Sequence, residues 1–318
     1  MDRFSPHFLL AMDHAQLAEW FRPTVCLHPK ENYWPCSFED YLAHCTLKRR
    51  STGELVEEKV TPDILAKYNK DPEDRALCLD CDPLFWTQRP IDVNDVPLYV
   101  KVDDTDAEMY WIQYWMFYSY NGALDIGCFS RAQCCPSNKA IIEAGAHQAD
   151  FEHISIYVYK KTMRIAKLYY SAHGDADGQW FNEDQITLTN SRHPLVYSAY
   201  HSHAHYATAG CVPRIFGCAN DFTEDDGPVW ESNNLQLLDR SDPVWQVYVG
   251  GLGFPDSGDV PANKESWTTE PNLSATWWSR LFRYLNLSCC CQAVVEDDAP
   301  PVPRISPIFS SSSSSSVR

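Results

Sequence analysis

Apolar and polar residues alternate along the middle of the chain in runs of strand length. β-Branched and aromatic residues dominate these runs, and clusters of Gly, Asn and Asp separate them, as is typical of strands joined by turns. The run 110–120 is apolar at both alternating positions, so we expect a central strand buried on both faces. The clearest runs are LYVKV (98–102), YWIQYWMFYSY (110–120), FEHISIYVY (151–159), RIAKLYYSA (164–172), PLVYSAYHS (194–202) and VWQVYVG (244–250).

Helical patterns are confined mainly to the N-terminal part of the chain. LAEWF (17–21) begins a short amphipathic helix. SFEDYLAHC (37–45) predicts a second helix, with Ser37 as N-cap and Asp40 in the capping-box position. Residues 51–90 are polar and predict an elaborated loop with one helix near PDILAKYN.

Strands that follow strands, with helices mostly at the ends, favour a mainly β fold, namely a β-sandwich with peripheral helices and long loops. The alternative is an α+β fold. A doubly wound α/β fold is disfavoured because the gaps between strands are too short for crossover helices. We divide the chain into an N-terminal lead (1–16), a single β-sandwich-type domain (17–288) and a Cys/Pro/Ser-rich tail (289–318), which we expect to be disordered.

The formal net charge of −17 over 318 residues limits the partners that the chain can bind. An acidic surface gains nothing from counterion release on a phosphate backbone, so we expect no nucleic-acid binding. No run approaches the roughly 18 consecutive apolar residues of a membrane span, and the start lacks a secretory signal pattern. We therefore expect no transmembrane segment and an intracellular, cytoplasmic location, where most of the 13 cysteines are small buried residues.

The segment WWSRLFRYLNLSCCC (277–291) allows two interpretations. Its apolar residues fall at helical spacing and three cysteines, Cys289, Cys290 and Cys291, follow at once. An interfacial helix with palmitoylated cysteines would give weak, reversible membrane attachment. We favour a C-terminal helix docked on the sandwich, because one helix with two arginines is a weak membrane signal.

The segment GAHQADFEHISIYVY (145–159) carries the densest set of candidate ligands. If it is a strand, Asp150 and Glu152 share one face with the aliphatic residues further along, so this is the inward face. Inward carboxylates imply a metal, a paired cation or a shared proton. His147 lies in the preceding turn and can fold over the same spot. These three side chains suit a divalent metal (Mg²⁺, Mn²⁺, Ca²⁺ or Zn²⁺), whereas the alternative is an edge strand with solvated acids.

Histidines recur in two further segments. His201, His203 and His205 alternate in AYHSHAHYATAG (199–210), so they share a face if the strand continues, and His173 ends another strand before a Gly/Asp turn. We predict that His173 and His203 line the same cavity and transfer protons, since imidazole titrates near neutrality. The alternative is a wet loop in which only one member of this histidine cluster matters.

Several motifs follow one another in a fixed order along the chain. They are FRPTVCLHPKENYWPCSFEDYL, YSYNG (118–122), HQADFEH (147–153), SAHGDADGQW (171–180), YHSHAHYATAG (200–210), NDFTEDDGPVW (220–230) and VYVGGLGFP (247–255). Taken in this order, they resemble the family of vacuolar protein sorting-associated protein 62. The Gly-Asp-Trp-Glu-His segment of that family falls on residues 149–153, its Ser-His pair on Ser202 and His203, and its strand-end His on His173.

Residues 145–152 are also similar to the necrosis- and ethylene-inducing-like cytolysins. These have a β-sandwich fold and a Gly-His-Arg-His-Asp-Trp-Glu heptad that binds a divalent metal. On this chain the heptad places ligands at His147, Asp150 and Glu152. The match is partial, because Ala149 stands where the cytolysins have their second His. The resemblance implies a sandwich and a metal site, and it does not imply toxicity.

Three hypotheses follow for the function. The first is a divalent-metal-binding protein that acts on a small molecule as a metal-assisted hydrolase, lyase or cyclase. The second is a non-catalytic module that recognises a lipid head group, a glycan or a protein. The third is a trafficking adaptor without such a site. The first hypothesis requires that residues 147–152 and residues 201–205 meet in space.

Overall fold

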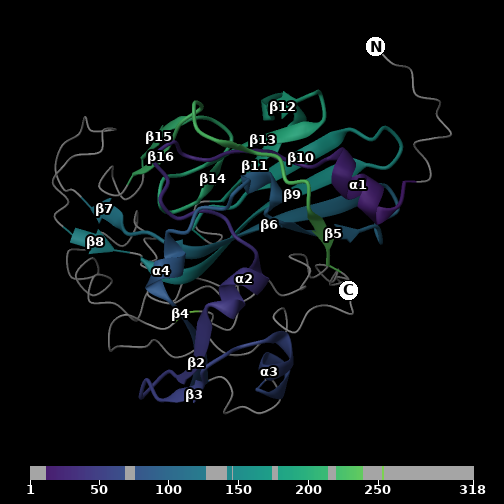
Figure 1. The fold of residues 1–318 in the computed structure, drawn as a ribbon. Coiled ribbons are helices and arrows are strands. Elements are labelled where there is room, and N and C mark those ends of the chain that lie inside the picture. The colour runs from purple at the N-terminus through teal and green to yellow at the C-terminus, as the bar shows by residue number, and fades with distance from the viewer. Residues whose placement is uncertain are drawn as a thin grey trace, which may run out of the picture.

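The structure is a computed structural model and describes residues 12–68, 76–126, 142–144, 146–173, 178–213, 220–238 and 253. Strands dominate this part of the chain, and two sheets lie face to face as the layers of a β-sandwich (Figure 1). Short helices lie around the layers. The predicted mainly β fold with peripheral helices is therefore confirmed, whereas the division of the chain into lead, domain and tail stays a prediction.

The larger layer is a sheet of six strands in the order β11-β10-β9-β6-β5-β18. Its neighbours are antiparallel except for β18 and β5, which are parallel. The strands predicted over 98–102, 110–120, 151–159 and 164–172 are confirmed as β5, β6, β9 and β10. The bounds are β5 (Leu98–Asp103), β6 (Met109–Asn121), β9 (His147–Tyr159), β10 (Ile165–Tyr170), β11 (Gln179–Asn182) and β18 (Leu235–Leu237).

The smaller layer is a sheet of five strands in the order β12-β13-β1-β17, with β14 attached to β13. Strands β1 and β13 are parallel, and the other pairs are antiparallel. Of these five strands, only β13 was predicted from the sequence. The other four have two or three residues, which is too short for alternation to be visible. The bounds are β1 (Thr24–Cys26), β12 (Leu188–Thr189), β13 (His193–Ser198), β14 (His205–Tyr206) and β17 (Val229–Trp230).

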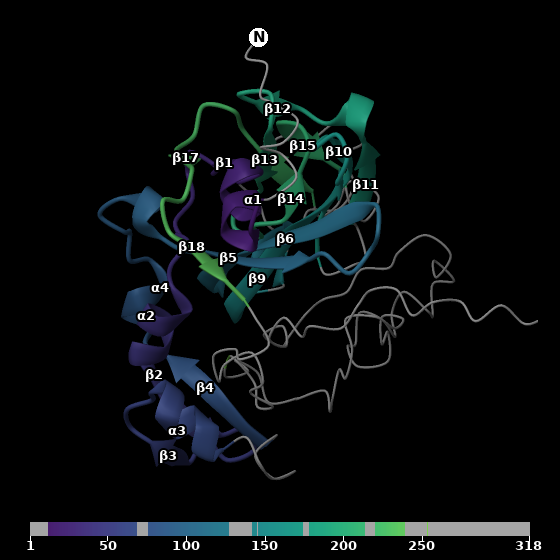
Figure 2. The same cartoon turned by 90° about the vertical axis from the view of Figure 1, so that its right-hand side faces the viewer.

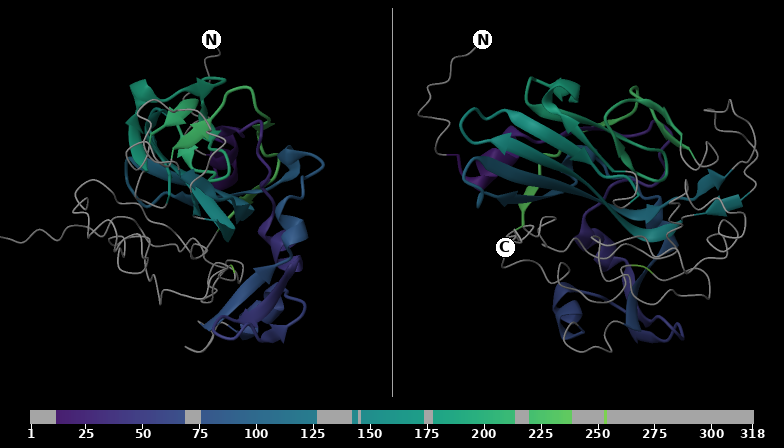
Figure 3. Two further views of the ribbon diagram at one scale, coloured as in Figure 1. Left: turned by 90° about the vertical axis from the view of Figure 1, so that its left-hand side faces the viewer. Right: turned by 180° about the vertical axis from the view of Figure 1, so that it is seen from behind.

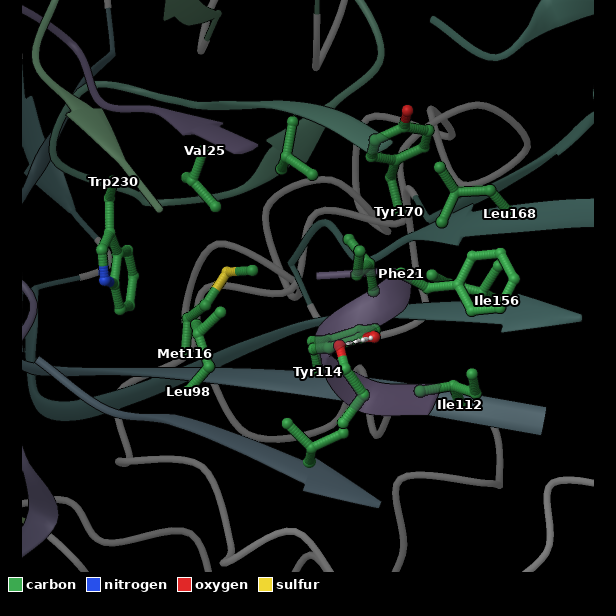
Figure 4. Packing of buried hydrophobic residues seen from close by; sticks show 14 of the residues in the cluster. Phe21, Val25, Leu98, Ile112, Tyr114, Met116, Ile156, Leu168, Tyr170 and Trp230 are labelled. Carbon is green, nitrogen blue, oxygen red and sulfur yellow. Dashed lines mark hydrogen bonds between the residues drawn. The ribbon is translucent and has the colours of Figure 1, made fainter. Parts of the chain in front are cut away.

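The main hydrophobic core fills the space between these two layers (Figure 4). Val25 and Trp230 from the smaller sheet face Met116 and Ile156 from the larger one, and all four side chains are fully buried. The indole N–H of Trp230 donates to the carbonyl oxygen of Val96 at 3.3 Å, so its polar atom is satisfied. Burying such side chains contributes about 1.5–3 kcal/mol each, which makes this interface the main force that joins the layers.

A second core covers the outer face of the larger sheet. Phe117 of β6 and Phe151 of β9 pack there against Phe38 and Tyr41 of helix α2. A small sheet in the order β3-β2-β4 lies beyond them and is seen from three further directions in Figure 2 and Figure 3. Strand β6 is thus covered on both faces, as predicted. The bounds are α2 (Phe38–Ala43), β2 (Cys45–Arg49), β3 (Leu55–Glu57), α3 (Pro62–Lys67), β4 (Leu77–Cys81) and α4 (Pro83–Trp86).

One prediction about this region is wrong, and another is confirmed with an earlier end. Residues 51–90 do not form a loop with one helix, because β3, β4 and α4 lie within them beside the expected α3. The helix predicted over 37–45 is confirmed as α2, which has Ser37 as N-cap and His44 as C-cap, and it ends at Ala43 because Cys45 already begins β2. The cause is the same in both cases, since short strands are stabilised by cross-strand pairs that the local pattern does not show.

The helices begin where a side-chain cap is available. Ser37 caps α2 as predicted, and its hydroxyl accepts the amide of Asp40 at 3.0 Å. Helix α1 (His14–Trp20) starts before the predicted position because Asp13 accepts the amide of Gln16 at 2.8 Å and completes a capping box. Capping therefore fixed these helix starts more firmly than the apolar pattern did.

The remaining described strands form two small pairs, β7 with β8 and β15 with β16. No helix in the described ranges is long and apolar enough to cross a membrane. The predictions for 244–250, 277–291 and 289–318 lie outside the described residues. The bounds are β7 (Leu124–Ile126), β8 (Ile142–Ala144), β15 (Gly210–Val212) and β16 (Asp221–Thr223).

The described cysteines are mostly unpaired. Five of them are free thiols, and four of these five are buried, as expected of small apolar residues. Cys211 differs because it is disulfide-bonded. The expectation of a reducing compartment did not anticipate this bond.

Candidate functional site

Two carboxylates of β9 point into the sandwich at one end of the core. Asp150 lies opposite Tyr118, and Glu152 lies opposite Met116, in the pairing of β9 with β6. Both acids are only 5% exposed. The prediction that they share the inward face is confirmed, because the same face continues into the main core. Buried carboxylates are costly unless they gain hydrogen-bond or charge partners.

His203 is the partner of Asp150. Its Nδ1 lies 2.9 Å from Oδ2 of Asp150, and its Nε2 lies 3.1 Å from the carbonyl oxygen of Tyr33. Both neighbours are acceptors, so both ring nitrogens carry protons and the ring is an imidazolium. Oε1 of Glu31 lies 3.8 Å from Nε2, beyond hydrogen-bond distance but close enough for charge attraction. The two clusters singled out in the sequence therefore meet in space.

Burial and charge act in opposite directions on this group. Burial alone lowers the pKa of His203, but the hydrogen bond to Asp150 and the attraction of Glu31 outweigh it and raise the pKa to about 9. Burial raises the pKa of Glu31, yet His203 and the amides of Tyr33 and His201 hold it below its ordinary value. Each of these two amides donates to Glu31 at 2.8 Å. Both His203 and Glu31 are therefore charged at neutral pH.

Tyr118 covers one face of the His203 ring. The two ring centroids are 3.7 Å apart and the ring planes differ by 3°. A cation stacked on an aromatic face is stabilised by the negative potential of that face. Burial, with the charges of Asp150, Glu31 and Glu152, raises the pKa of Tyr118 well above its ordinary value. Three carboxylates thus surround one phenol.

Glu152 is held at the end of β10. The hydroxyl of Ser171 donates to Oε2 of Glu152 and accepts the amide of His153 at 2.8 Å. The amide of His205 donates to the carbonyl oxygen of Ser171 at 2.8 Å, and Nδ1 of His205 lies 3.3 Å from the carbonyl oxygen of His153. These bonds tie β9, β10 and β14 together at one corner.

Two imidazole nitrogens at this corner are buried without a partner among the described residues. They are Nδ1 of His153 and Nε2 of His205. Burial lowers the pKa of His153 to about 3 and that of His205 to about 4, so both rings are neutral at physiological pH. A buried nitrogen without a partner is unusual in a folded protein, and a bound water or ion is one way to satisfy it.

His147 is the first residue of β9, and its ring has a defined tautomer. Its Nδ1 lies 3.1 Å from the carbonyl oxygen of Ala149, so Nδ1 carries a proton and Nε2 is the nitrogen that can coordinate a metal. Metal-binding histidines show this arrangement, in which one nitrogen donates to a carbonyl and the other coordinates. Ala149 itself has a left-handed φ of 57°, which bends the start of the strand.

The three predicted metal ligands have suitable chemistry, but they are not drawn together. Among the residues whose positions are described, no three His, Cys, Asp or Glu side chains form a group that could hold a metal ion. Asp150 and Glu152 offer hard oxygen atoms and His147 an imidazole nitrogen, a donor set that fits Mg²⁺, Mn²⁺, Ca²⁺ or Zn²⁺. Each of the three already has one orienting partner.

A second carboxylate–imidazole pair lies beside the first. Oδ2 of Asp221 lies 2.7 Å from Nε2 of His173, and the hydroxyls of Ser202 and Tyr206 donate to the same carboxylate at 2.9 and 2.5 Å. Because Ser202 precedes His203, one turn serves both pairs. The side chain of Asp221 is 0% exposed, whereas that of His173 is 15% exposed.

The turn between β13 and β14 places the histidines of this segment. Strand β13 ends at Ser198, and His201 and His203 have left-handed φ angles of 64° and 55°. The strand predicted over 194–202 is therefore wrong in its last residues. The predicted alternation of His201, His203 and His205 on one face is wrong for the same reason, because left-handed residues interrupt the alternation of a strand.

Backbone strain is concentrated at this end of the sandwich. Ala149, His173, His201 and His203 all have left-handed φ, which is uncommon for residues other than glycine. Such conformations cost of order 1–3 kcal/mol each and cluster at functional sites, where the surrounding structure enforces them. This strain is independent of the charges, and it also indicates that these residues form a functional site.

The residues that sequence reasoning missed are Glu31, Tyr118, Ser171 and Asp221. Tyr118 and Ser171 lie in predicted strands, but the strand pattern gives no polar role to either. The partners of these residues lie far away along the chain, as with Glu31 and His201, which are 170 positions apart. The one available signal is that each falls within a motif that carries the family resemblance. That signal marks segments and does not say which side chain in them matters.

Comparisons with known proteins give a family and a set of distant relatives. The family described as vacuolar protein sorting-associated protein 62 matches residues 10–236. "Putative vacuolar protein sorting-associated protein TDA6" of Saccharomyces cerevisiae is 24% identical over 253 residues, which are 66% of this chain and 50% of the relative. "Vacuolar protein sorting-associated protein 62" of the same yeast is 24% identical over 248 residues, 66% of this chain and 49% of the relative. The chain thus spans about half the length of these relatives.

Solved structures give weaker matches. Necrosis and Ethylene inducing Protein 2 from the causal agent of cocoa's Witches Broom disease is 13% identical, with a TM-score of 0.33 over 72% of this chain and 74% of that one. NLPPya in complex with glucosamine is 11% identical, with a TM-score of 0.33 over 76% of this chain and 84% of that one. NLPPya in complex with mannosamine is also 11% identical, with a TM-score of 0.34 over 76% of this chain and 84% of that one.

Proposed function

The chain belongs to the vacuolar protein sorting-associated protein 62 family. On this premise we propose that its acidic corner, formed by Glu31, Asp150 and Glu152 around His203, binds a divalent cation together with a small-molecule ligand. The proposal concerns the sandwich alone, because the yeast relatives are about twice as long as the matched part. The reaction class that suits the corner is a cation-assisted hydrolysis, elimination or cyclisation.

The observation that carries the proposal is a cluster of buried carboxyl groups around Tyr118. Glu31, Asp150 and Glu152 are at most 6% exposed, and the charges of all three act on the phenol of Tyr118. Among the described residues, His203 is an imidazolium in contact with Asp150 and near Glu31, and the buried rings of His153 and His205 are neutral. Carboxylates removed from water need compensating positive charge, and a divalent cation supplies it in one step.

The ligands in this proposal are Asp150 and Glu152, with Nε2 of His147 as the third donor. When bound, the cation would act as a Lewis acid on a carbonyl or phosphoryl oxygen or lower the pKa of a bound water. His203 keeps Asp150 oriented, because both of its nitrogens are engaged and its ring has no exposed surface. Proton transfer therefore falls to His173, whose side chain is partly exposed.

The test is metal content by elemental mass spectrometry on untagged protein, combined with calorimetric titration with Mg²⁺, Mn²⁺, Ca²⁺ and Zn²⁺. Wild type is compared with Asp150→Ala/Glu152→Ala and with the milder Glu152→Gln, which keeps an acceptor for Ser171. A control double variant, Asp104→Ala/Glu183→Ala, removes two carboxylates that are 55% and 44% exposed. Circular dichroism confirms that each variant is folded.

We expect one equivalent of a divalent cation in wild type and in the control, and its loss in the double variant. Absence of a cation from wild type, with no change of thermal stability on adding any of the four ions, would overturn the proposal. Equal loss in the control would assign binding to diffuse surface charge. Either result would favour a binding module for a lipid head group, a glycan or a protein, or a trafficking adaptor.

A further inference from the structure

We infer that His173 and Asp221 form a general acid–base centre, in which Asp221 is a positioning residue that leaves Nδ1 of His173 to exchange a proton with a ligand. The inference deepens the proposed function, because it names the group that moves the proton and the residue that orients it. The carboxylate–imidazole contact itself does not depend on a bound cation.

The geometry fixes which ring nitrogen faces the ligand. A carboxylate can only accept, so the 2.7 Å contact with Asp221 requires that Nε2 of His173 carries a proton. The neutral ring then has its lone pair on Nδ1. The side chain of His173 remains 15% exposed although its partner is completely buried. Nε2 of His173 is therefore bonded to Asp221, and no residue in the described ranges bonds its Nδ1, which is available to a ligand.

Hydrogen bonds hold the carboxylate of Asp221 in place and favour its ionised form. It accepts the hydroxyl protons of Ser202 and Tyr206 in addition to the ring N–H. Hydrogen bonds to the charged form stabilise a buried carboxylate. A carboxylate that only had to cap a loop would not need three side-chain donors, whereas one that orients a base and stabilises its imidazolium is used in this way by hydrolytic triads.

The backbone supports the same interpretation. His173 has a left-handed φ of 52°, a conformation that is unfavourable for a residue with a side chain. It immediately follows the buried Ala172 at the end of β10, where the strand has left the sheet. The strained backbone directs the ring to Asp221, on the element β16 that follows 48 residues later.

The ligand either carries a hydroxyl group or is attacked by water, because His173 must receive its proton from an O–H group. Nδ1 accepts a proton from an O–H group, either a hydroxyl of the ligand or a water that attacks it. The imidazolium formed is neutralised by Asp221, and the proton is returned from Nδ1 to the leaving oxygen or to the product. The oxygen that gives up the proton forms a bond to the carbonyl carbon or phosphorus of the ligand, and the bond from that atom to the leaving oxygen breaks. No proton is gained or lost overall, no oxidant is required, and water is the one co-reactant when the step is a hydrolysis.

The test is the protonation pattern of His173, measured by nitrogen-15 NMR of the imidazole rings in the full chain at a pH where the ring is neutral. Wild type is compared with Asp221→Asn. His14 and Asp104 provide a matched control, because the same two atom types lie 3.2 Å apart there while the side chains are 46% and 55% exposed. Cation content is measured in parallel.

In wild type we expect a single Nε2–H tautomer at His173, with a ring N–H proton that exchanges slowly with water. Asp221→Asn should remove the slowly exchanging proton and give mixed tautomers, as at His14. It should leave cation content unchanged. The rate of His173 acylation by diethyl pyrocarbonate, read by peptide mass spectrometry, should change at least several-fold in Asp221→Asn and stay constant in Asp104→Asn.

A mixture of tautomers or an Nδ1–H tautomer in wild type would overturn the inference even if Asp221→Asn fails to fold. If wild type contains no cation but shows the Nε2–H signal of His173, the proposed cation site is contradicted and the inference about His173 stands. The two failures are therefore distinguishable. Unchanged His173 signals and acylation rate in a folded Asp221→Asn variant would reduce Asp221 to a structural residue and also overturn the inference.

Discussion

Asp150 and His203 are 53 residues apart in the sequence, and Nδ1 of His203 lies 2.9 Å from the carboxylate of Asp150 in the interior. One residue comes from a central strand of the larger sheet and the other from a turn of the smaller sheet. Their contact therefore ties the two layers together at the polar end of the sandwich. The same contact makes His203 the positive centre around which the buried carboxylates are arranged.

Breaking this pair should be costly. We expect Asp150→Asn to lower the free energy of unfolding by about 3–5 kcal/mol, because it leaves the His203 charge buried without its closest counter-charge. The measurement is urea denaturation at pH 7. The exposed pair of His14 and Asp104 gives the control, and Asp104→Asn should change stability by less than about 1 kcal/mol. Equal effects of both substitutions would contradict a charged His203.

Stability should be highest near pH 6.5. The pKa of His203 is raised to about 9 in the fold, so its contribution is complete below 6.5 and is lost as pH rises from there through 9. The pKa values of His153 and His205 are lowered to about 3 and 4, so protonation of the unfolded chain removes stability as pH falls below 6.5. Glu31, whose pKa is lowered, adds to the loss below pH 4.5.

The pH prediction is checked by denaturant unfolding across pH 4 to 10. The alkaline loss assigned to His203 is on the order of 3 kcal/mol. In His203→Gln this alkaline slope should disappear, while the acid slope remains. A stability curve that stays flat between pH 7 and 9 in wild type would show that His203 does not carry the charge inferred from its two acceptors.

Trp230 should be the main anchor of the smaller sheet. Its side chain is fully buried in the core between the layers, so Trp230→Ala should lower the free energy of unfolding by about 3–5 kcal/mol. Val229 lies next to it in β17 and is 46% exposed, so Val229→Ala should cost less than about 1 kcal/mol. Thermal and urea unfolding measure both. A small effect of Trp230→Ala would argue against the sandwich core.

Gly122 should tolerate no side chain. A Cβ there would lie 2.4 Å from Cε2 of Tyr33 and 2.8 Å from Cγ of His201, and both rings are packed against further aromatic residues. We expect Gly122→Ala to destabilise the fold by about 1–3 kcal/mol. The ring signals of Tyr33 and His201 should shift in NMR spectra. Unchanged stability and spectra would mean that this loop corner is loosely packed.

The sequence by itself determined the strands that are long enough to show their period. The runs at 98–102, 110–120, 151–159 and 164–172 became the central strands, and alternation alone placed Asp150 and Glu152 on the inward face. Burial of apolar side chains is strong enough to fix which face of a long strand turns inward. The capping residue Ser37 was equally readable, because a cap depends on neighbours in sequence.

Only the tertiary structure decided what those carboxylates meet. Strands of two or three residues, the turn that gives His203 a left-handed φ, and the three donors of Asp221 all depend on contacts between distant segments. Such contacts leave no local period, because each uses a single residue whose partner is elsewhere in the chain. The sequence therefore located the segments of the corner, whereas the packing of the two sheets chose His203 as the charged centre and Asp221 as the partner of His173.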